Sequence, residues 1–347
     1  MTLQIGVIGC GGITRAHIEG WKQSASRAKV VAFADVSEAA MAQRQAQLGY
    51  DVTFYSDYHK LLASGEVDAV DICLPHHLHK EAIVATAQAG KHLMTEKPLC
   101  LNLGEAAEIE AAVRASGITM MASHNQLFFP AVQQAKKMIL KGSLGKIYMV
   151  HSYDCSARDP ALNPDKSKWG EVPAVFKDAW RTDPAKMGGG ELIDTGYHPT
   201  YRLLFLAGET PKEVTSMLGT YRLPLKEEDT SEVLVKFEDG MIGHIFTSWA
   251  VRAPGARPIL FSVMGEFGQL WGERNALYYQ PVGFNEPAVV EYPPQSGAGT
   301  IAAEIDHFVD AIVNGYEPLH SVAEATDTLR IILAAYESVD GSRTVRI

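Results

Sequence analysis

The first third of the chain alternates short apolar segments with stretches rich in Ala, Glu and Gln, and this alternation limits the possible fold more than any other feature. The apolar segments predict strands at residues 3–8, 29–34, 52–55, 69–74, 91–95 and 118–122. Several of the intervening helical stretches end in glycine, the residue expected just past a helix. Since parallel strands are joined by crossover helices, we predict a doubly wound parallel sheet of the α/β class over residues 1–122.

The sequence pattern changes after residue 123, where long runs alternate apolar and polar residues as half-exposed strands do. Asp239-Gly240 separates two such runs and predicts a hairpin. Helices are predicted at 131–140, 301–314 and 322–336. We therefore predict that residues 123–347 form an α+β domain on a large, open, mostly antiparallel sheet. The free face of such a sheet predicts a homodimer or homotetramer built through this domain.

The composition narrows the classes of partner. The 347 residues carry a formal net charge of −10, which argues against nucleic acid and anionic membranes because both require a basic face. No apolar run approaches the roughly 20 residues of a membrane span. The chain starts with a strand rather than a basic leader, and its four cysteines are scattered without CxxC spacing. We therefore expect a cytoplasmic protein with reduced thiols.

A glycine-rich segment, IGVIGCGGIT, follows the first strand directly. Gly9 permits a tight turn, and Gly11 lets a pyrophosphate approach the backbone amides at a helix N-terminus. Gly12 and Ile13 extend the same turn, whereas Thr14 occupies the third fingerprint position in place of Gly or Ala. A GxG pair alone is weak evidence, and a purely structural turn is the alternative, but its position at the first strand–helix junction predicts a dinucleotide site.

Asp35 ends the second predicted strand, 23 residues past Gly12. This spacing suits a carboxylate that accepts the ribose 2′-hydroxyl. A 2′-phosphate would be repelled by Asp35, and no Arg or Lys lies in DVSEAAMAQ to receive it, so NAD is favoured over NADP. The alternative role of Asp35 is to cap the helix that starts near Ser37, and the two roles are compatible.

The fourth and fifth predicted strands deliver polar residues to the carboxyl edge of the sheet, where ligands bind in open α/β sheets. His76 and His77 are adjacent and point apart on most backbones, and no partner ligands are identifiable, so we expect no metal. The residues expected to line the nicotinamide side of the cleft are Leu74, Pro75, His76, His79, Glu96 and Lys97.

A second polar constellation lies far downstream in GGGELIDTGYH. Asp194 and His198 are spaced i, i+4, which on one helix places a carboxylate and an imidazole on the same face. A simple ion pair on a surface helix is the alternative.

The segments GVIGCGGI, EKP, WRTDPAKMGGG and GGGELIDTGYH together resemble the Gfo/Idh/MocA oxidoreductases over nearly the whole chain. The resemblance implies a catalytic trio of Lys97, Asp194 and His198. His198 would act as general base, Asp194 would orient it or stabilise its charged form, and Lys97 would donate a hydrogen bond to the substrate oxygen. It also implies a cis peptide before Pro98, which would turn Lys97 toward the substrate.

The remaining pocket residues follow from the same resemblance and from strand periodicity. Many relatives carry arginines in the stretch that here begins at Asn125, and their loss favours a neutral substrate. The residues expected to contact substrate beside the trio are Asn125, His151, Tyr153, Trp180 and Arg181, although Arg181 has an alternative role in a structural salt bridge. The segment 157–173, with Trp169, is interpreted as a lid or as an arm that contacts another subunit.

The expected function is an NAD-dependent dehydrogenase that oxidises a secondary hydroxyl of a neutral sugar, a glycoside or a cyclic polyol such as inositol. Two alternatives use the same architecture: a glycosidase that recycles NAD through transient oxidation at C3, and a non-catalytic cofactor-binding regulator. The intact trio and the absence of a basic DNA-binding helix disfavour the regulator.

Overall fold

The computed structural model describes residues 2–158, 179–251, 259–295 and 297–347. The chain forms two compact units, one of Met1–Phe128 with Ser296–Thr326 and the other of Phe129–Gln295 with Asp327–Ile347. The single division at residue 122 stays a prediction about domains, and it did not anticipate that a late segment groups with the first unit.

The first unit is a six-stranded parallel sheet in the order β3-β2-β1-β4-β5-β6. The strands are β1 (Leu3–Ile8), β2 (Ala28–Ala34), β3 (Thr53–Tyr55), β4 (Ala69–Ile72), β5 (His92–Glu96) and β6 (Met120–Ser123). The helices are α1 (Thr14–Gln23), α2 (Glu38–Leu48), α3 (Tyr58–Ala63), α4 (His79–Gln88), α5 (Leu103–Ser116) and α11 (Gly297–Asn314), with short 3₁₀ turns at His76–Leu78 and Asn125–Phe128. The predicted doubly wound sheet is thereby confirmed.

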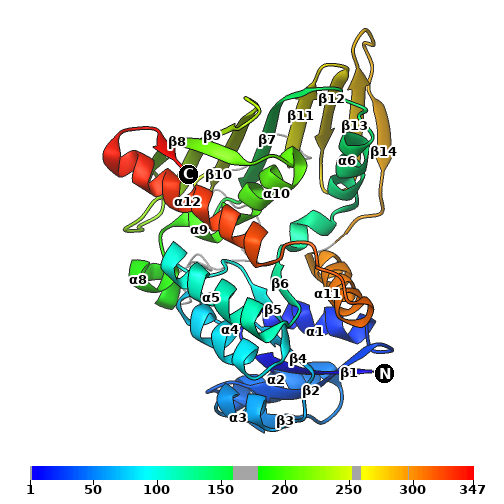
Figure 1. Cartoon of the computed structure of the whole chain (residues 1–347), viewed down its shortest axis with the longest axis vertical. Coiled ribbons are helices and arrows are strands. Elements are labelled where there is room, and N and C mark those ends of the chain that lie inside the picture. The colour runs from blue at the N-terminus through cyan, green and yellow to red at the C-terminus, as the bar shows by residue number, and fades with distance from the viewer. Residues whose placement is uncertain (1, 159–178, 252–258, 296) are drawn as a thin grey trace. The chain divides into compact units, whose positions relative to one another are not determined.

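Helix α11 lies against α1 and completes the core of this unit (Figure 1). Gly20 makes the contact possible, because a Cβ built there would stand 2.6 Å from Ile305 Cδ1. Ile305, Phe308 and Val309 of α11 are fully buried. The sequence predicted this helix but assigned it to the second domain, since nothing local marks which core an amphipathic helix joins.

The second unit is a nine-stranded sheet in the order β14-β13-β12-β11-β7-β10-β9-β8-β15, antiparallel except for the pair β7 and β10. Its strands are β7 (Ile147–Cys155), β8 (Pro211–Gly219), β9 (Thr230–Phe237), β10 (Ile242–Ser248), β11 (Phe261–Gly265), β12 (Gly268–Gly272), β13 (Ala276–Pro281), β14 (Ala288–Glu291) and β15 (Val345–Arg346). The hairpin predicted at Asp239-Gly240 joins β9 to β10.

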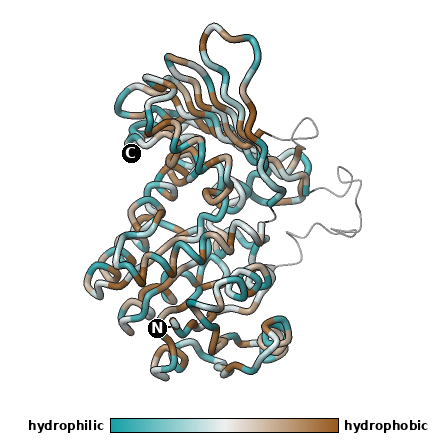
Figure 2. The backbone as a smooth tube through the Cα atoms, turned by 90° about the vertical axis from the view of Figure 1, so that its right-hand side faces the viewer, coloured by the Kyte–Doolittle hydropathy of each residue, from teal (hydrophilic) through white to brown (hydrophobic). Residues whose placement is uncertain are grey.

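The helices of this unit are α6 (Pro130–Leu140), α8 (Pro184–Met187), α9 (Glu191–Asp194), α10 (Tyr197–Ala207) and α12 (Val322–Gly341), with a 3₁₀ turn at Ala179–Thr182. Helix α10 packs on β7 and β10, and α6 packs on β12 and β13, while α12 runs beside β8, where Ser216 Oγ donates to the Ala335 carbonyl at 2.5 Å. Apolar stretches follow the strands of the sheet in Figure 2, and Val233, Val235 and Phe237 of β9 are buried. Among the described helices, none has the length and apolar character that a membrane span requires.

Candidate functional site

The glycine turn after β1 is held tightly by its own unit. Gly9 has φ +92°, its N–H donates to the Ala34 carbonyl at 2.8 Å, and a Cβ built on it would stand 2.5 Å from the Cys73 carbonyl oxygen. Thr14, buried at the start of α1, donates from Oγ1 to the Gly9 carbonyl at 2.8 Å. Thr14 at the third fingerprint position therefore braces the turn by a hydrogen bond.

The next two glycines have a different reason to be glycine. A Cβ built at Gly11 or at Gly12 meets no protein atom within 4 Å, so the fold itself leaves room for a side chain at both positions. The space beside these backbone groups lies at the N-terminal end of α1, where Ile13 is 42% exposed. A surface of this kind fits a pyrophosphate that approaches the main chain closely.

Asp35, directly after β2, is half-buried and turned toward the glycine turn. Its Oδ2 accepts from the Cys10 N–H at 2.6 Å, and its Oδ1 accepts from the Ser37 N–H at 2.7 Å. The N-cap of α2 is Ser37, whose Oγ accepts from the Ala40 N–H at 3.2 Å. The carboxylate thus stands beside the glycine turn, where the ribose hydroxyl of a dinucleotide is expected.

His79 connects the turns that follow β4 and β5. Its side chain is fully buried, with Nδ1 2.6 Å from the Pro98 carbonyl oxygen and Nε2 2.8 Å from the Leu74 carbonyl oxygen. Burial lowers the pKa of His79 below its usual range. The Lys97–Pro98 peptide is cis, as the resemblance implied. His76 is also buried, and its ring lies 6.1 Å from that of His79.

Glu96 and Lys97 end β5 at the same carboxyl edge as the glycine turn. Glu96 Oε2 accepts from the Lys97 N–H at 3.1 Å, and Glu96 Oε1 lies 3.0 Å from His17 Nε2. The other ring nitrogen of His17 lies 2.9 Å from Asp71 Oδ2, which also accepts from Trp21 Nε1 at 2.7 Å. Sequence analysis missed His17 because a histidine among apolar helix residues shows no sign of its distant partners.

His17, Asp71 and Cys73 bring their side-chain ligand atoms within 4.8 Å of one another, the spacing of a metal site. Hydrogen bonding nevertheless uses these atoms, because both His17 nitrogens face carboxylate oxygens and Asp71 receives Trp21 as well. Burial raises the pKa of the Cys73 thiol to about 12, so it stays protonated. These atoms fit a hydrogen-bonded cluster better than a metal centre.

In the second unit, Asp194 and His198 do not share one helix. Asp194 ends α9, the chain turns at Thr195 and Gly196, and His198 lies in the first turn of α10. A Cβ on Gly196 would stand 2.6 Å from the Leu192 carbonyl oxygen, so this turn requires glycine. The prediction of a single helix was wrong here, because the glycine of the motif allows a close turn that interrupts the helix.

Each of these two side chains has a neighbour that sequence analysis did not assign to it. Arg181 Nε donates to Asp194 Oδ2 at 3.2 Å, and the Arg181 guanidinium stacks on Trp180, 4.3 Å from the ring centroid. His198 Nδ1 lies 2.7 Å from the Tyr201 hydroxyl, one turn along α10. Of the two roles considered for Arg181, the structure thus shows the salt bridge, and its partner is Asp194 itself.

Buried acids support α9 from behind. Glu228 Oε1 accepts from the Leu192 N–H at 2.8 Å and from the Tyr336 hydroxyl at 2.9 Å, and the Gly190 N–H donates to the same hydroxyl at 3.3 Å. Desolvation raises the pKa of Glu228 to about 7, and it raises the pKa of the fully buried Glu191 well above its usual range. The start of α9 is therefore held by a carboxyl group and a phenol.

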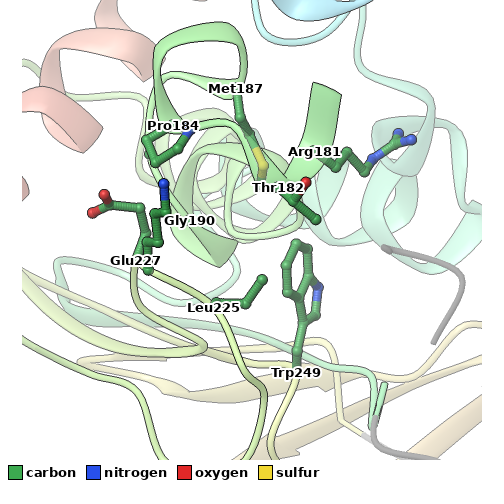
Figure 3. A pocket seen from close by; sticks show the side chains of 10 residues that line it. Arg181, Thr182, Pro184, Met187, Gly190, Leu225, Glu227 and Trp249 are labelled. Carbon is green, nitrogen blue, oxygen red and sulfur yellow. The ribbon is translucent and has the colours of Figure 1, made fainter. Parts of the chain in front are cut away.

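A small cavity lies between the α8 turn and β10 (Figure 3). Its walls include Arg181, Thr182, Met187 and Trp249, and the Met187 sulfur and the Trp249 indole point into it. Trp249 is anchored by a bond from Nε1 to Thr195 Oγ1 at 2.7 Å. The volume is about 10 Å³, which is room for one water at most and excludes a sugar from this cavity.

His151 and Tyr153 lie on the face of the sheet that α10 does not cover. Arg202 of α10 donates to Ser152 Oγ at 3.1 Å, which shows that Ser152 faces the helix. Alternation along β7 puts His151 and Tyr153 on the other face, where the His151 ring lies 5.1 Å from that of His244. The two side chains therefore lie on the opposite face of the sheet from α10, the helix that carries His198, and their contact with substrate stays a prediction.

Asn125 lies in the 3₁₀ turn after β6, where its Nδ2 donates to Thr300 Oγ1 of α11 at 3.0 Å. Its amide therefore has a structural partner in the first unit. Trp169 and all but two residues of the segment 157–173 lie outside the described residues.

Comparison with known proteins matches each unit to a described protein family. The family described as "Oxidoreductase family, NAD-binding Rossmann fold" matches residues 3–124, and "GFO/IDH/MocA C-terminal domain" matches residues 132–271. The chain belongs to the GFO/IDH/MocA oxidoreductases. The resemblance seen in the sequence is confirmed, and so are NAD as cofactor and the assignment as an oxidoreductase.

Individual relatives cover the whole chain. The myo-inositol 2-dehydrogenase of Thermotoga maritima is 25% identical over 99% of this chain and 98% of the relative. The inositol 2-dehydrogenase of Rhizobium meliloti is 26% identical over 100% of both chains. Among solved structures, levoglucosan dehydrogenase in complex with NADH and levoglucosan superposes with a TM-score of 0.88 at 22% identity over 100% of both chains, which supports the fold.

Proposed function

We propose that the protein is an NAD-dependent dehydrogenase that oxidises a secondary hydroxyl of a neutral sugar, glycoside or cyclic polyol. The proposal is carried by one observation about an NAD-binding family fold. Lys97 follows β5 directly, with its N–H bound by Glu96, and the Tyr201 hydroxyl contacts His198 at Nδ1. NAD, when bound, supplies the acceptor for the substrate hydride.

His198 is the proposed general base. Its Nδ1 is engaged by the Tyr201 hydroxyl, so Nε2 is the nitrogen that takes the proton of the substrate hydroxyl. In the tautomer that suits this role, Nδ1–H donates to the Tyr201 oxygen and Nε2 carries the lone pair. The helix turn at Thr195 and Gly196 fixes the angle at which the ring leaves α10.

Lys97 and Asp194 are the proposed electrostatic partners. The Lys97 ammonium donates a hydrogen bond to the substrate oxygen and stabilises the negative charge that develops as the proton leaves. Asp194, paired with Arg181 and 5% exposed, is the carboxylate proposed to stabilise the imidazolium that forms on His198. The mechanism requires the ammonium and the imidazole to reach the same hydroxyl.

The substrate class rests on the charge of the chain and on its relatives. No arginine or lysine occurs between residues 115 and 135, the stretch that follows α5 and contains Asn125. A substrate phosphate or carboxylate would find no counter-charge in this stretch, which favours a neutral substrate. The relatives named as inositol and levoglucosan dehydrogenases favour cyclic polyols and anhydrosugars.

Two further proposals concern the setting of the enzyme. The four free cysteines, three of them buried, favour a reducing compartment, and we propose the cytoplasm. Leu234 and Ile242 are 51% and 43% exposed on neighbouring strands of the large sheet, and we propose that the uncovered face of the sheet joins identical subunits.

A substrate panel with catalytic variants tests the function. Inositols, aldoses, anhydrosugars and aryl glycosides are incubated with NAD and with NADP, and the reduced nicotinamide is followed by absorbance. We expect Lys97→Ala and His198→Ala each to lower kcat at least about a hundredfold while the affinity for NAD stays within a few-fold. The matched controls are Lys212→Ala and His59→Ala, which change the same residue types on the surface. Wild-type turnover in either catalytic variant would remove that residue from the mechanism, and release of aglycone without NADH would point to glycoside cleavage.

A further inference from the structure

His17 occupies an unusual position for a helix residue of an α/β domain. Its side chain is fully buried, and its two ring nitrogens face two different carboxylates, Asp71 Oδ2 at 2.9 Å and Glu96 Oε1 at 3.0 Å. A neutral imidazole has one N–H, whereas donation to both carboxylates requires two. The geometry is therefore that of an imidazolium held between two anions.

The surrounding groups are consistent with a charged ring. Burial alone would favour the neutral imidazole, but the charge and hydrogen bond of Asp71 outweigh it and raise the pKa of His17. The other titratable groups that face it are the thiol of Cys73 and the carboxyl of Glu304 on α11. Burial raises the pKa of the Glu304 carboxyl well above its usual range, so Glu304 is neutral.

Glu96 is the partly exposed member of this cluster. Its side chain is 13% exposed, in contrast to the fully buried His17 and Asp71, and its second oxygen accepts the N–H of Lys97. One carboxylate thus joins the buried imidazole to the main chain of the proposed catalytic lysine.

We propose that His17 is a positioning residue that holds the Glu96 side chain turned inward, so that the Glu96–Lys97 corner presents the carboxylate to bound NAD and the ammonium to substrate. The inference rests on the proposed function for the role of Lys97. It adds a residue on α1 that contacts neither the cofactor nor the reacting atoms and acts through Glu96.

The test compares two variants of the same cluster. His17→Asn carries its N–H donors on a single nitrogen of a shorter side chain, so it cannot reach the two carboxylates that face opposite ring nitrogens of His17. Trp21→Phe removes the other side-chain nitrogen that donates to Asp71 and leaves Glu96 untouched, so it is the matched control. Binding of NADH is followed by its fluorescence between pH 5.5 and pH 8.5, and thermal unfolding of each protein is recorded in parallel.

We expect His17→Asn to weaken NADH binding about tenfold over this pH range, because the Glu96 side chain loses the contact that holds it inward. Wild-type protein and Trp21→Phe should bind NADH equally well. The double variant His17→Asn/Glu96→Gln should bind NADH as Glu96→Gln alone does, because His17 acts only through Glu96.

A lower unfolding temperature of His17→Asn with wild-type affinity for NADH would show that His17 is only structural and would overturn the proposal. If His17→Asn does not fold, Glu96→Asp replaces it, since the shorter carboxylate keeps its charge but loses the contact with His17, and wild-type affinity in that variant overturns the proposal equally. Because the readout is NADH binding, a protein that binds NADH with the expected affinities but oxidises no polyol would refute the proposed function alone.

Discussion

Glu228→Gln should change how the stability of the second unit depends on pH. The Glu228 carboxyl is 6% exposed and accepts hydrogen bonds from the Leu192 N–H and the Tyr336 hydroxyl at the start of α9. Desolvation raises its pKa from 4.5 to about 7. Since the folded pKa exceeds the unfolded one, the stabilisation is complete below about pH 4.5 and is lost as the pH rises through about 7.

The size of this pH-dependent change in stability follows from the pKa shift of Glu228. Each pKa unit corresponds to about 1.4 kcal/mol, so the group contributes a total of about 3 kcal/mol, of which about 2.5 kcal/mol is lost between pH 5 and pH 8. Glutamine keeps the shape and an acceptor oxygen but does not ionise, so this part of the pH dependence vanishes in the variant.

Urea unfolding of both proteins at pH 5 and pH 8, followed by tryptophan fluorescence, measures the difference. The free energy of unfolding of wild-type protein should fall by about 2.5 kcal/mol more than that of Glu228→Gln. Titrating groups that do not interact with Glu228 contribute equally to both proteins and cancel, whereas Glu191 and Tyr336 interact with it directly. The exposed Glu238→Gln is the control and should follow wild type within about 0.5 kcal/mol. Parallel pH dependences for wild type and Glu228→Gln would refute the reasoning.

Two further substitutions test the geometry of the site. Gly9→Ala places a methyl group 2.5 Å from the Cys73 carbonyl at φ +92°, so it should lower the unfolding temperature and abolish NAD binding. The control Gly240→Ala has φ +91° but no atom within 4 Å of the new methyl group, so it should cost only about 1 kcal/mol of stability. Equal unfolding temperatures for the two variants would contradict the steric argument. Tyr201→Phe removes the hydroxyl that contacts His198 Nδ1, so it should lower kcat about tenfold and shift the pH–rate profile. The control is Tyr148→Phe, which changes an exposed tyrosine. An unchanged pH–rate profile in Tyr201→Phe would show that Tyr201 does not orient the base.

The first unit shows what local sequence patterns predict well. Each of its strands was predicted to within a few residues, because buried parallel strands are continuous apolar runs between turn residues. Gly49 and Gly117 end their helices in the left-handed conformation, as their positions indicated. The proximity of Asp35 to the glycine turn could also be predicted, because the two lie within one short strand–helix–strand unit whose geometry depends on local spacing.

The features that sequence analysis missed depend on three-dimensional contacts that the local sequence pattern does not show. The cluster around His17 joins residues 17, 71, 96 and 304, and none of these positions is unusual within its own segment. The break between α9 and α10 depends on how closely Gly196 approaches the Leu192 carbonyl, which helical periodicity does not encode. The assignment of Arg181 to Asp194 likewise required coordinates, since both a substrate contact and a salt bridge suit an arginine at that position.

The return of α11 to the first unit has a consequence for protein synthesis. A ribosome that has translated the glycine turn, Asp35 and Lys97 has made every residue of the cofactor edge, yet the apolar side of α1 still lacks the helix that covers it. The nascent nucleotide-binding half therefore stays unfinished until residues 296–326 emerge, nearly at the end of the chain. A fragment that stops at residue 128 should consequently be poorly soluble, even though it carries the complete dinucleotide fingerprint.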